Sequence, residues 1–129
     1  MRENGLWHPR LAELVTAMGH TDILVLADAG LPVPSGVETI DLVWRRGQPP
    51  LIPVLDAVLG ELVVERATIA DEAKDPVFLG SLDRTIKDIP VVRTSHAELK
   101  RRCRHARAVV RTGEDTPYAN VILHAGVAF

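Results

Sequence analysis

The amino-acid sequence predicts an α/β fold, a single three-layer domain over residues 1–129 with a mostly parallel sheet flanked by helices. Aliphatic runs of strand length alternate along the chain with segments of helical periodicity. Hydrophobic residues make up 47% of the chain but aromatic residues only 4%, a composition typical of parallel strands buried on both faces. A length of 129 residues fits one domain.

Each element follows from periodicity and from turn signals. The expected helices have apolar residues three and four positions apart, and they cover 11–18, 51–59, a short segment after Pro76, and 96–105. The first ends at Gly19, a predicted C-cap, and the last opens with Ser95 and Glu98 in a capping box. The expected strands are apolar and rich in β-branched residues, and they cover 23–27, 39–44, 62–69, 89–93, 108–111 and 121–127.

Composition excludes several function classes. The formal charge is −2, which does not suit a nucleic-acid partner, and the basic run 100–107 is interpreted as a solvated helix face. No apolar run approaches the length of a membrane helix, and charged residues interrupt the N-terminus where a signal peptide would be apolar. The single cysteine, Cys103, excludes an intrachain disulfide and is expected to be inert. We therefore expect a cytoplasmic protein.

Polar side chains follow several predicted strands, where ligands bind in open α/β sheets. Asp28 follows the first strand, and His96 lies just after the fourth. Tyr118-Ala119-Asn120 lie in the loop after the fifth strand, and their phenol and carboxamide suit sugar hydroxyls. The alternatives are structural, with Asp28 initiating a turn, His96 as an exposed helix residue and Asn120 as part of the loop. His124, in an apolar strand, is expected to be a satisfied core or interface histidine.

His20 has a different position, just past the first helix and therefore at the opposite edge of the sheet. The carbonyl end of a helix favours the imidazolium form, and Asp22 and Asp28 could add to this effect. A histidine held protonated is a suitable proton donor. The alternative is a histidine that only caps the helix. The opposite edges imply that His20 meets the other candidates through unusual packing or across a subunit interface.

Motifs for other chemistries are absent. The sequence has no zinc-type His/Cys cluster, no Gly-rich dinucleotide or phosphate loop, and no nucleophile elbow. We therefore expect neither metal nor cofactor. The remaining His, Asp, Tyr and Asn side chains suit proton transfer on a small polyhydroxylated ligand.

Several short motifs, in order along the chain, carry a family resemblance. They are Gly19-His20-Thr21-Asp22, Asp28-Ala29-Gly30-Leu31-Pro32-Val33-Pro34, Thr94-Ser95-His96, Arg111-Thr112-Gly113-Glu114, Pro117-Tyr118-Ala119-Asn120 and Ala125-Gly126-Val127. In these residues the chain resembles the D-ribose pyranase family, the sugar mutarotases of ribose operons. The resemblance extends from about residue 4 to the end. Leu6-Trp7-His8-Pro9 departs from it, because the family more often has Leu-Asn before the helix.

The resemblance implies cofactor-free acid/base ring opening and closure that interconverts β-D-ribopyranose and β-D-ribofuranose and supplies ribokinase. It implies His20 as proton donor and Asp28, His96, Tyr118, Ala119 and Asn120 as substrate contacts. It also implies a ring-shaped homo-oligomer, a decamer of two pentamers, with the site at a subunit interface. His96, Asp28 and water are alternatives for the base. The alternative functions are L-fucose mutarotase, which typically has a bulkier segment at Gly30-Leu31, and a non-catalytic sugar-binding or regulatory protein.

Overall fold

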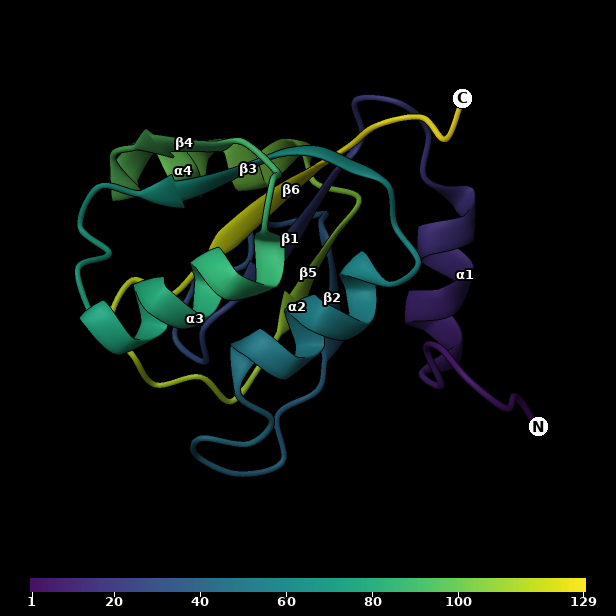
Figure 1. Ribbon diagram of the computed structural model, residues 1–129. Coiled ribbons are helices and arrows are strands. Elements are labelled where there is room, and N and C mark those ends of the chain that lie inside the picture. Colours follow the sequence, from purple (N-terminus) through teal and green to yellow (C-terminus); the bar gives the residue numbers. More distant parts are fainter.

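Six strands form one mixed sheet in the order β2-β5-β1-β6-β3-β4 (Figure 1). The computed structural model describes residues 1–129. The strands are β1 (Ile23–Ala27), β2 (Glu38–Asp41), β3 (Val64–Ala70), β4 (Val91–Thr94), β5 (Ala108–Arg111) and β6 (Val121–Ala125). The pairs β1–β5, β2–β5 and β3–β4 are parallel, whereas β6 is antiparallel to both of its neighbours, β1 and β3.

The expectation that the strands run parallel is therefore confirmed for every strand except β6. That strand lies in the middle of the sheet rather than at an edge. It can reverse direction there because the loop between β5 and β6 begins and ends at the same sheet edge, so no crossover helix is needed. All five residues of β6 are buried.

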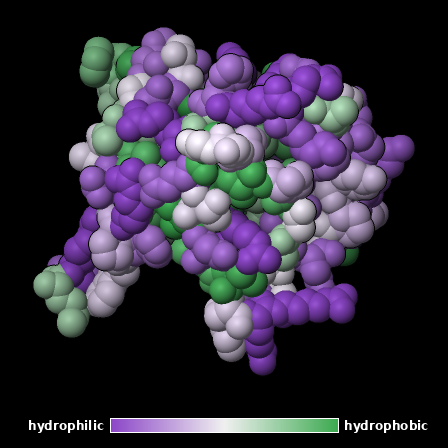
Figure 2. Space-filling model, turned by 180° about the vertical axis from the view of Figure 1, so that it is seen from behind, coloured by the Kyte–Doolittle hydropathy of each residue, from purple (hydrophilic) through white to green (hydrophobic).

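Helices cover the two faces of the sheet unequally. On one face α1 (Pro9–Ala17), α2 (Leu51–Leu59) and α3 (Pro76–Ile86) enclose a core of 22 buried residues. On the other face α4 (His96–Arg102), continued by a 3-10 turn at Cys103–His105, covers a cluster of only 8. Seen from behind, apolar side chains reach the surface in the middle of the molecule, between hydrophilic ones (Figure 2). Every helix is shorter than a bilayer-spanning segment requires.

The structure corrects several local expectations: the helix after Pro76 is the longest of the four rather than short, and the last strand ends at Ala125 rather than at residue 127. The second strand ends at Asp41 rather than Trp44, because the chain turns back through a bridge between Arg45 and Gln48. Gly19 is not the C-cap of α1: that residue is Met18, and the positive φ of 72° belongs to Thr21. Of the expected capping box, only the Ser95 half forms, since Glu98 pairs with Arg101 and Arg102 instead.

Two sequence expectations for single residues are confirmed. Cys103 is fully buried, and desolvation raises the pKa of its thiol to about 11, so the reactive thiolate is disfavoured. His124 is 7% exposed and bonds to the Thr68 hydroxyl at 3.0 Å, and burial lowers its pKa. His124 is therefore a core histidine whose hydrogen bond is satisfied within the chain, as its place in an apolar strand predicts.

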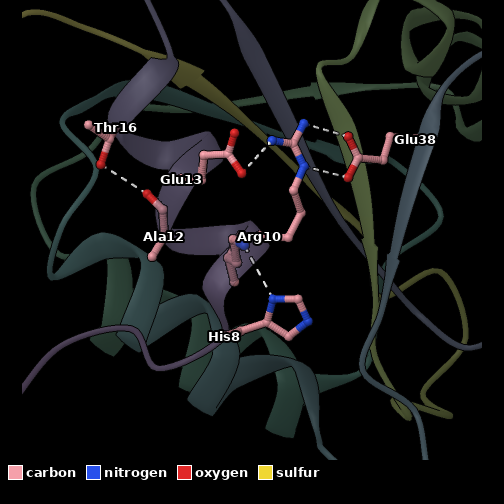
Figure 3. Close-up of polar contacts among 7 residues, drawn as sticks. His8, Arg10, Ala12, Glu13, Thr16 and Glu38 are labelled. Carbon is pink, nitrogen blue, oxygen red and sulfur yellow. Dashed lines mark hydrogen bonds and ion pairs between the residues drawn. The ribbon is translucent and has the colours of Figure 1, made fainter. Parts of the chain in front are cut away.

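Helix α1 is held by polar contacts at its first turn (Figure 3). His8 is the N-cap residue, and its Nδ1 accepts a hydrogen bond from the Leu11 amide at 3.2 Å. The Arg10 guanidinium forms two 2.7 Å hydrogen bonds to the Glu38 carboxylate on β2 and an ion pair with Glu13. The His8 that departs from the family pattern thus takes the capping role that a short polar side chain usually fills.

We expect the protein to lose stability in acid. The Arg10 guanidinium lowers the pKa of Glu38, Arg101 and Arg102 lower that of Glu98, and the Gly19 amide lowers that of Asp22. A carboxyl group with a lower pKa in the folded state stabilises that state above its unfolded pKa, and this stabilisation disappears as the pH falls through the folded pKa. Urea unfolding at fixed protein concentration should therefore show stability falling from pH 5 toward pH 3. Glu38→Gln should flatten this fall, and an unchanged pH dependence in that variant would contradict the assignment.

Candidate functional site

One part of the candidate site lies at the carboxyl ends of the parallel strands, where a cavity of about 310 Å³ opens. It is lined by Asp28, Gly30, Leu31, Pro32, His96, Pro117 and Tyr118. Three of the predicted substrate contacts thus meet in one chain, because β1, β4 and β5 all end at this edge. The volume is in the range of a small-molecule site.

Asp28 is fixed by contacts on both sides of its carboxylate. Its Oδ1 accepts a hydrogen bond from the Gly30 amide at 2.9 Å, which forms the turn that the sequence indicates. Its Oδ2 accepts from the Asn120 carboxamide at 3.1 Å, and the Asn120 Oδ1 accepts from the Asp28 amide at 2.8 Å. Asn120 is fully buried, so it orients Asp28 from behind and does not itself line the cavity.

His96 and Tyr118 form the aromatic wall of the cavity. Their rings meet edge to face, with centroids 4.9 Å apart and an interplanar angle of 77°. His96 Nδ1 is buried in the single chain and has no hydrogen-bond partner there. Tyr118 is 40% exposed and has a φ of 60°, a value that non-glycine residues adopt at a cost.

The loop that carries Tyr118 is held by the turn at residues 47–50. Gly113 and this turn exchange two backbone hydrogen bonds of 2.8 Å, through the Gly47 amide and the Pro49 carbonyl. A Cβ atom on Gly113 would lie 2.6 Å from the Gln48 carbonyl carbon, so only glycine fits at this approach. Ala119 is fully buried in the core and outside the cavity lining, so its side chain anchors the loop.

Sequence reasoning missed Glu72, which positions His96. Both carboxylate oxygens of Glu72 accept from the His96 amide, at 3.1 Å each. A carboxylate is stabilised at this helix end by the free amides and by the helix dipole. No local motif reveals the role, because Glu72 lies 24 residues before its partner.

The other part of the candidate site is the turn between α1 and β1, which presents His20. In Figure 1 this turn lies at the upper right beside the C-terminal segment, while the loop between β5 and β6 runs along the lower left. Asp28 follows β1 and His20 precedes it, so the five residues of β1, at about 3.3 Å each, separate them by roughly 17 Å. Within one chain, His20 therefore does not reach the cavity at Asp28, as its place in the sequence predicts.

The turn at His20 is held in a defined shape. The Asp22 carboxylate accepts from the Gly19 amide at 2.9 Å and from Arg107 at 2.8 Å. The Thr21 amide donates to the Ala125 carbonyl at 3.0 Å, with Thr21 in the left-handed region. The sequence suggested Asp22 and Asp28 as the acidic neighbours of His20. The structure instead places Glu65 there, with its Oε2 3.1 Å from His20 Nε2.

Comparison with known proteins identifies the class. The model of the RbsD / FucU transport protein family matches residues 1–128, and the chain belongs to this family. The chain is 45% identical over its full length to D-ribose pyranase from Geobacillus thermodenitrificans, covering 99% of that protein. The identity to D-ribose pyranase from Chromobacterium violaceum is 46%, with all of both chains covered. These similarities confirm the family resemblance carried by the motifs.

Solved structures give the same result. RbsD from Bacillus subtilis complexed with D-ribose superimposes with a TM-score of 0.95 at 40% identity, and all of both chains is covered. The fucose mutarotase from Streptococcus pneumoniae in complex with L-fucose gives a TM-score of 0.81 at 26% identity, covering 96% of this chain and 100% of that one. Within the family, the structure is therefore more similar to the ribose-bound member than to this fucose-bound one.

Proposed function

We propose that the protein, as a single D-ribose pyranase-like domain over residues 1–129, interconverts the pyranose and furanose forms of D-ribose. The observation that carries the proposal is the cavity at Asp28, His96 and Tyr118, with its oriented carboxylate, in a chain similar over its full length to D-ribose pyranases. Carboxylate, phenol and imidazole groups are suitable partners for sugar hydroxyls. Such a neutral ligand also suits a chain of low net charge.

In the proposed reaction, His20 protonates the ring oxygen of ribopyranose while a base takes the proton of the anomeric hydroxyl. The bond between the anomeric carbon and the ring oxygen breaks, which gives the open aldehyde. The hydroxyl on carbon 4 then attacks the aldehyde with the reverse proton transfers, and the furanose ring closes. Asp28, His96 and water are the candidates for the base. Positioned acid and base groups give about 10²–10⁴-fold acceleration.

The two parts of the site are proposed to come together between copies of the chain. His20 of one copy would complete the cavity at Asp28 of the next. A contact between two different edges is heterologous, and its repetition gives a ring when the rotation between copies closes. We propose a decamer of two stacked pentamers in the cytoplasm, whose product supplies ribokinase. Apolar side chains reach the surface between hydrophilic ones on the face seen in Figure 2, which supports association of copies.

Magnetization-exchange NMR tests the function. Signals of ribopyranose and ribofuranose should exchange faster when the protein is added, and L-fucose anomers measured side by side should respond less. Acceleration of fucose exchange alone would assign the protein to the fucose branch of the family. Binding of D-ribose with no acceleration of either exchange would show a non-catalytic sugar-binding protein.

A further inference from the structure

Glu65 occupies an irregular position in the sheet. Val64 on β3 pairs with Ala125 on β6, and Arg66 pairs with His124, so β3 advances two residues where β6 advances one. The extra residue of this β-bulge is Glu65. Bulges redirect a side chain and are frequent beside active sites.

Gly126 provides the room for this bulge. Its amide donates to the Val63 carbonyl at 2.9 Å, which holds the chain after β6 against the start of β3. A Cβ atom on Gly126 would lie 3.3 Å from the Glu65 Cβ, which is tighter than most side-chain contacts, and 3.4 Å from Val63 Cγ1. Glycine at position 126 therefore leaves room for the Glu65 Cβ.

The bulge directs Glu65 to His20. Glu65 Oε2 lies 3.1 Å from His20 Nε2, and its other oxygen lies 4.0 Å from an Arg66 guanidinium nitrogen. A carboxylate only accepts hydrogen bonds, so Nε2 of His20 must be the donor in this contact. When one ring nitrogen of a histidine donates a hydrogen bond to a fixed acceptor, the proton of the neutral ring stays on that nitrogen.

We propose that Glu65 is a positioning residue for His20, which holds Nε2 protonated and leaves Nδ1 to transfer the proton to the sugar. The inference rests on the proposed function, because Glu65 acts only through His20, the proton donor of that reaction. The ion pair contributes little to stability, since the two side chains are 53% and 39% exposed in one chain. Its effect is on the orientation and tautomer of the imidazole, as for carboxylates behind other functional histidines.

Nitrogen-15 NMR of the imidazole tests the proposal without reference to activity. At a pH where His20 is neutral, the wild-type protein should carry the proton on Nε2. Glu65→Leu should give a mixture of the two tautomers. Glu65→Gln keeps an acceptor but loses the charge, so its tautomer ratio should lie between those of the wild-type and Glu65→Leu proteins. A wild-type His20 protonated on Nδ1 would overturn the proposal.

Exchange rates supply the second measurement. Glu65→Leu should slow ribose exchange by about 10–100-fold, whereas Glu13→Leu, which removes an exposed carboxylate paired with Arg10, should leave it unchanged. If His20→Ala abolishes the acceleration but Glu65→Leu does not slow it, the role of Glu65 is wrong and the function stands. If the wild-type protein does not accelerate exchange, the proposed function fails. The tautomer measurement still tests whether Glu65 holds the proton on His20 Nε2.

Discussion

Replacement of His20 with alanine should slow the exchange of ribopyranose and ribofuranose by about 10²–10⁴-fold, which is the usual contribution of a positioned acid. The sugar should still bind, because Asp28, His96 and Tyr118 line the cavity and remain intact. The measurement is magnetization exchange for the rate and calorimetry for the affinity.

His105→Ala is the matched control, since His105 is also an exposed histidine but lies in the turn after α4. It should keep the wild-type rate. A His20→Ala protein that accelerates exchange as well as the wild-type protein would show that another group is the donor.

Replacement of Asp28 with alanine should weaken D-ribose binding by about 10–100-fold, because a hydrogen bond to a charged group contributes about 1.5–3 kcal/mol and each 1.4 kcal/mol is tenfold in affinity. The change also leaves the carboxamide of the fully buried Asn120 without its acceptor. We therefore expect a lower melting temperature as well as weaker binding.

Asp83→Ala, at an exposed position on α3, controls for the loss of a carboxylate elsewhere and should change neither quantity. Folding of the Asp28→Ala protein is checked by circular dichroism before titration. Wild-type affinity in a folded Asp28→Ala protein would place the sugar outside this cavity.

Much of the fold could be predicted because the pattern of buried residues is local. The bounds of β1, α2 and β5 agree with the segments expected from apolar runs and helical spacing. The direction of β6 could not be predicted, since a fully buried strand reads the same in either direction. The early end of β2 depends on the bridge between Arg45 and Gln48, which residue types alone do not indicate.

Part of the candidate site could likewise be predicted from the sequence, and part of it could not. Asp28, His96 and Tyr118 could be grouped because strands that run in one direction end at one edge of the sheet, and the separation of His20 follows from its position before β1. Glu65 and Glu72 could not be found, because their contacts span 45 and 24 residues. The role of Glu65 also requires a bulge that no sequence signal announces.

We propose that each working site combines His20 of one copy with Asp28 of another. The most direct test mixes His20→Ala and Asp28→Ala proteins in equal amounts, unfolds them and refolds them together. Random assembly pairs an intact His20 with an intact Asp28 at about a quarter of the sites, so exchange activity should return to about that fraction of the wild-type value. If, at a ribose concentration too low to saturate the Asp28→Ala protein, the mixture stays as slow as its two components while co-refolded wild-type protein regains activity, the site is not shared between copies.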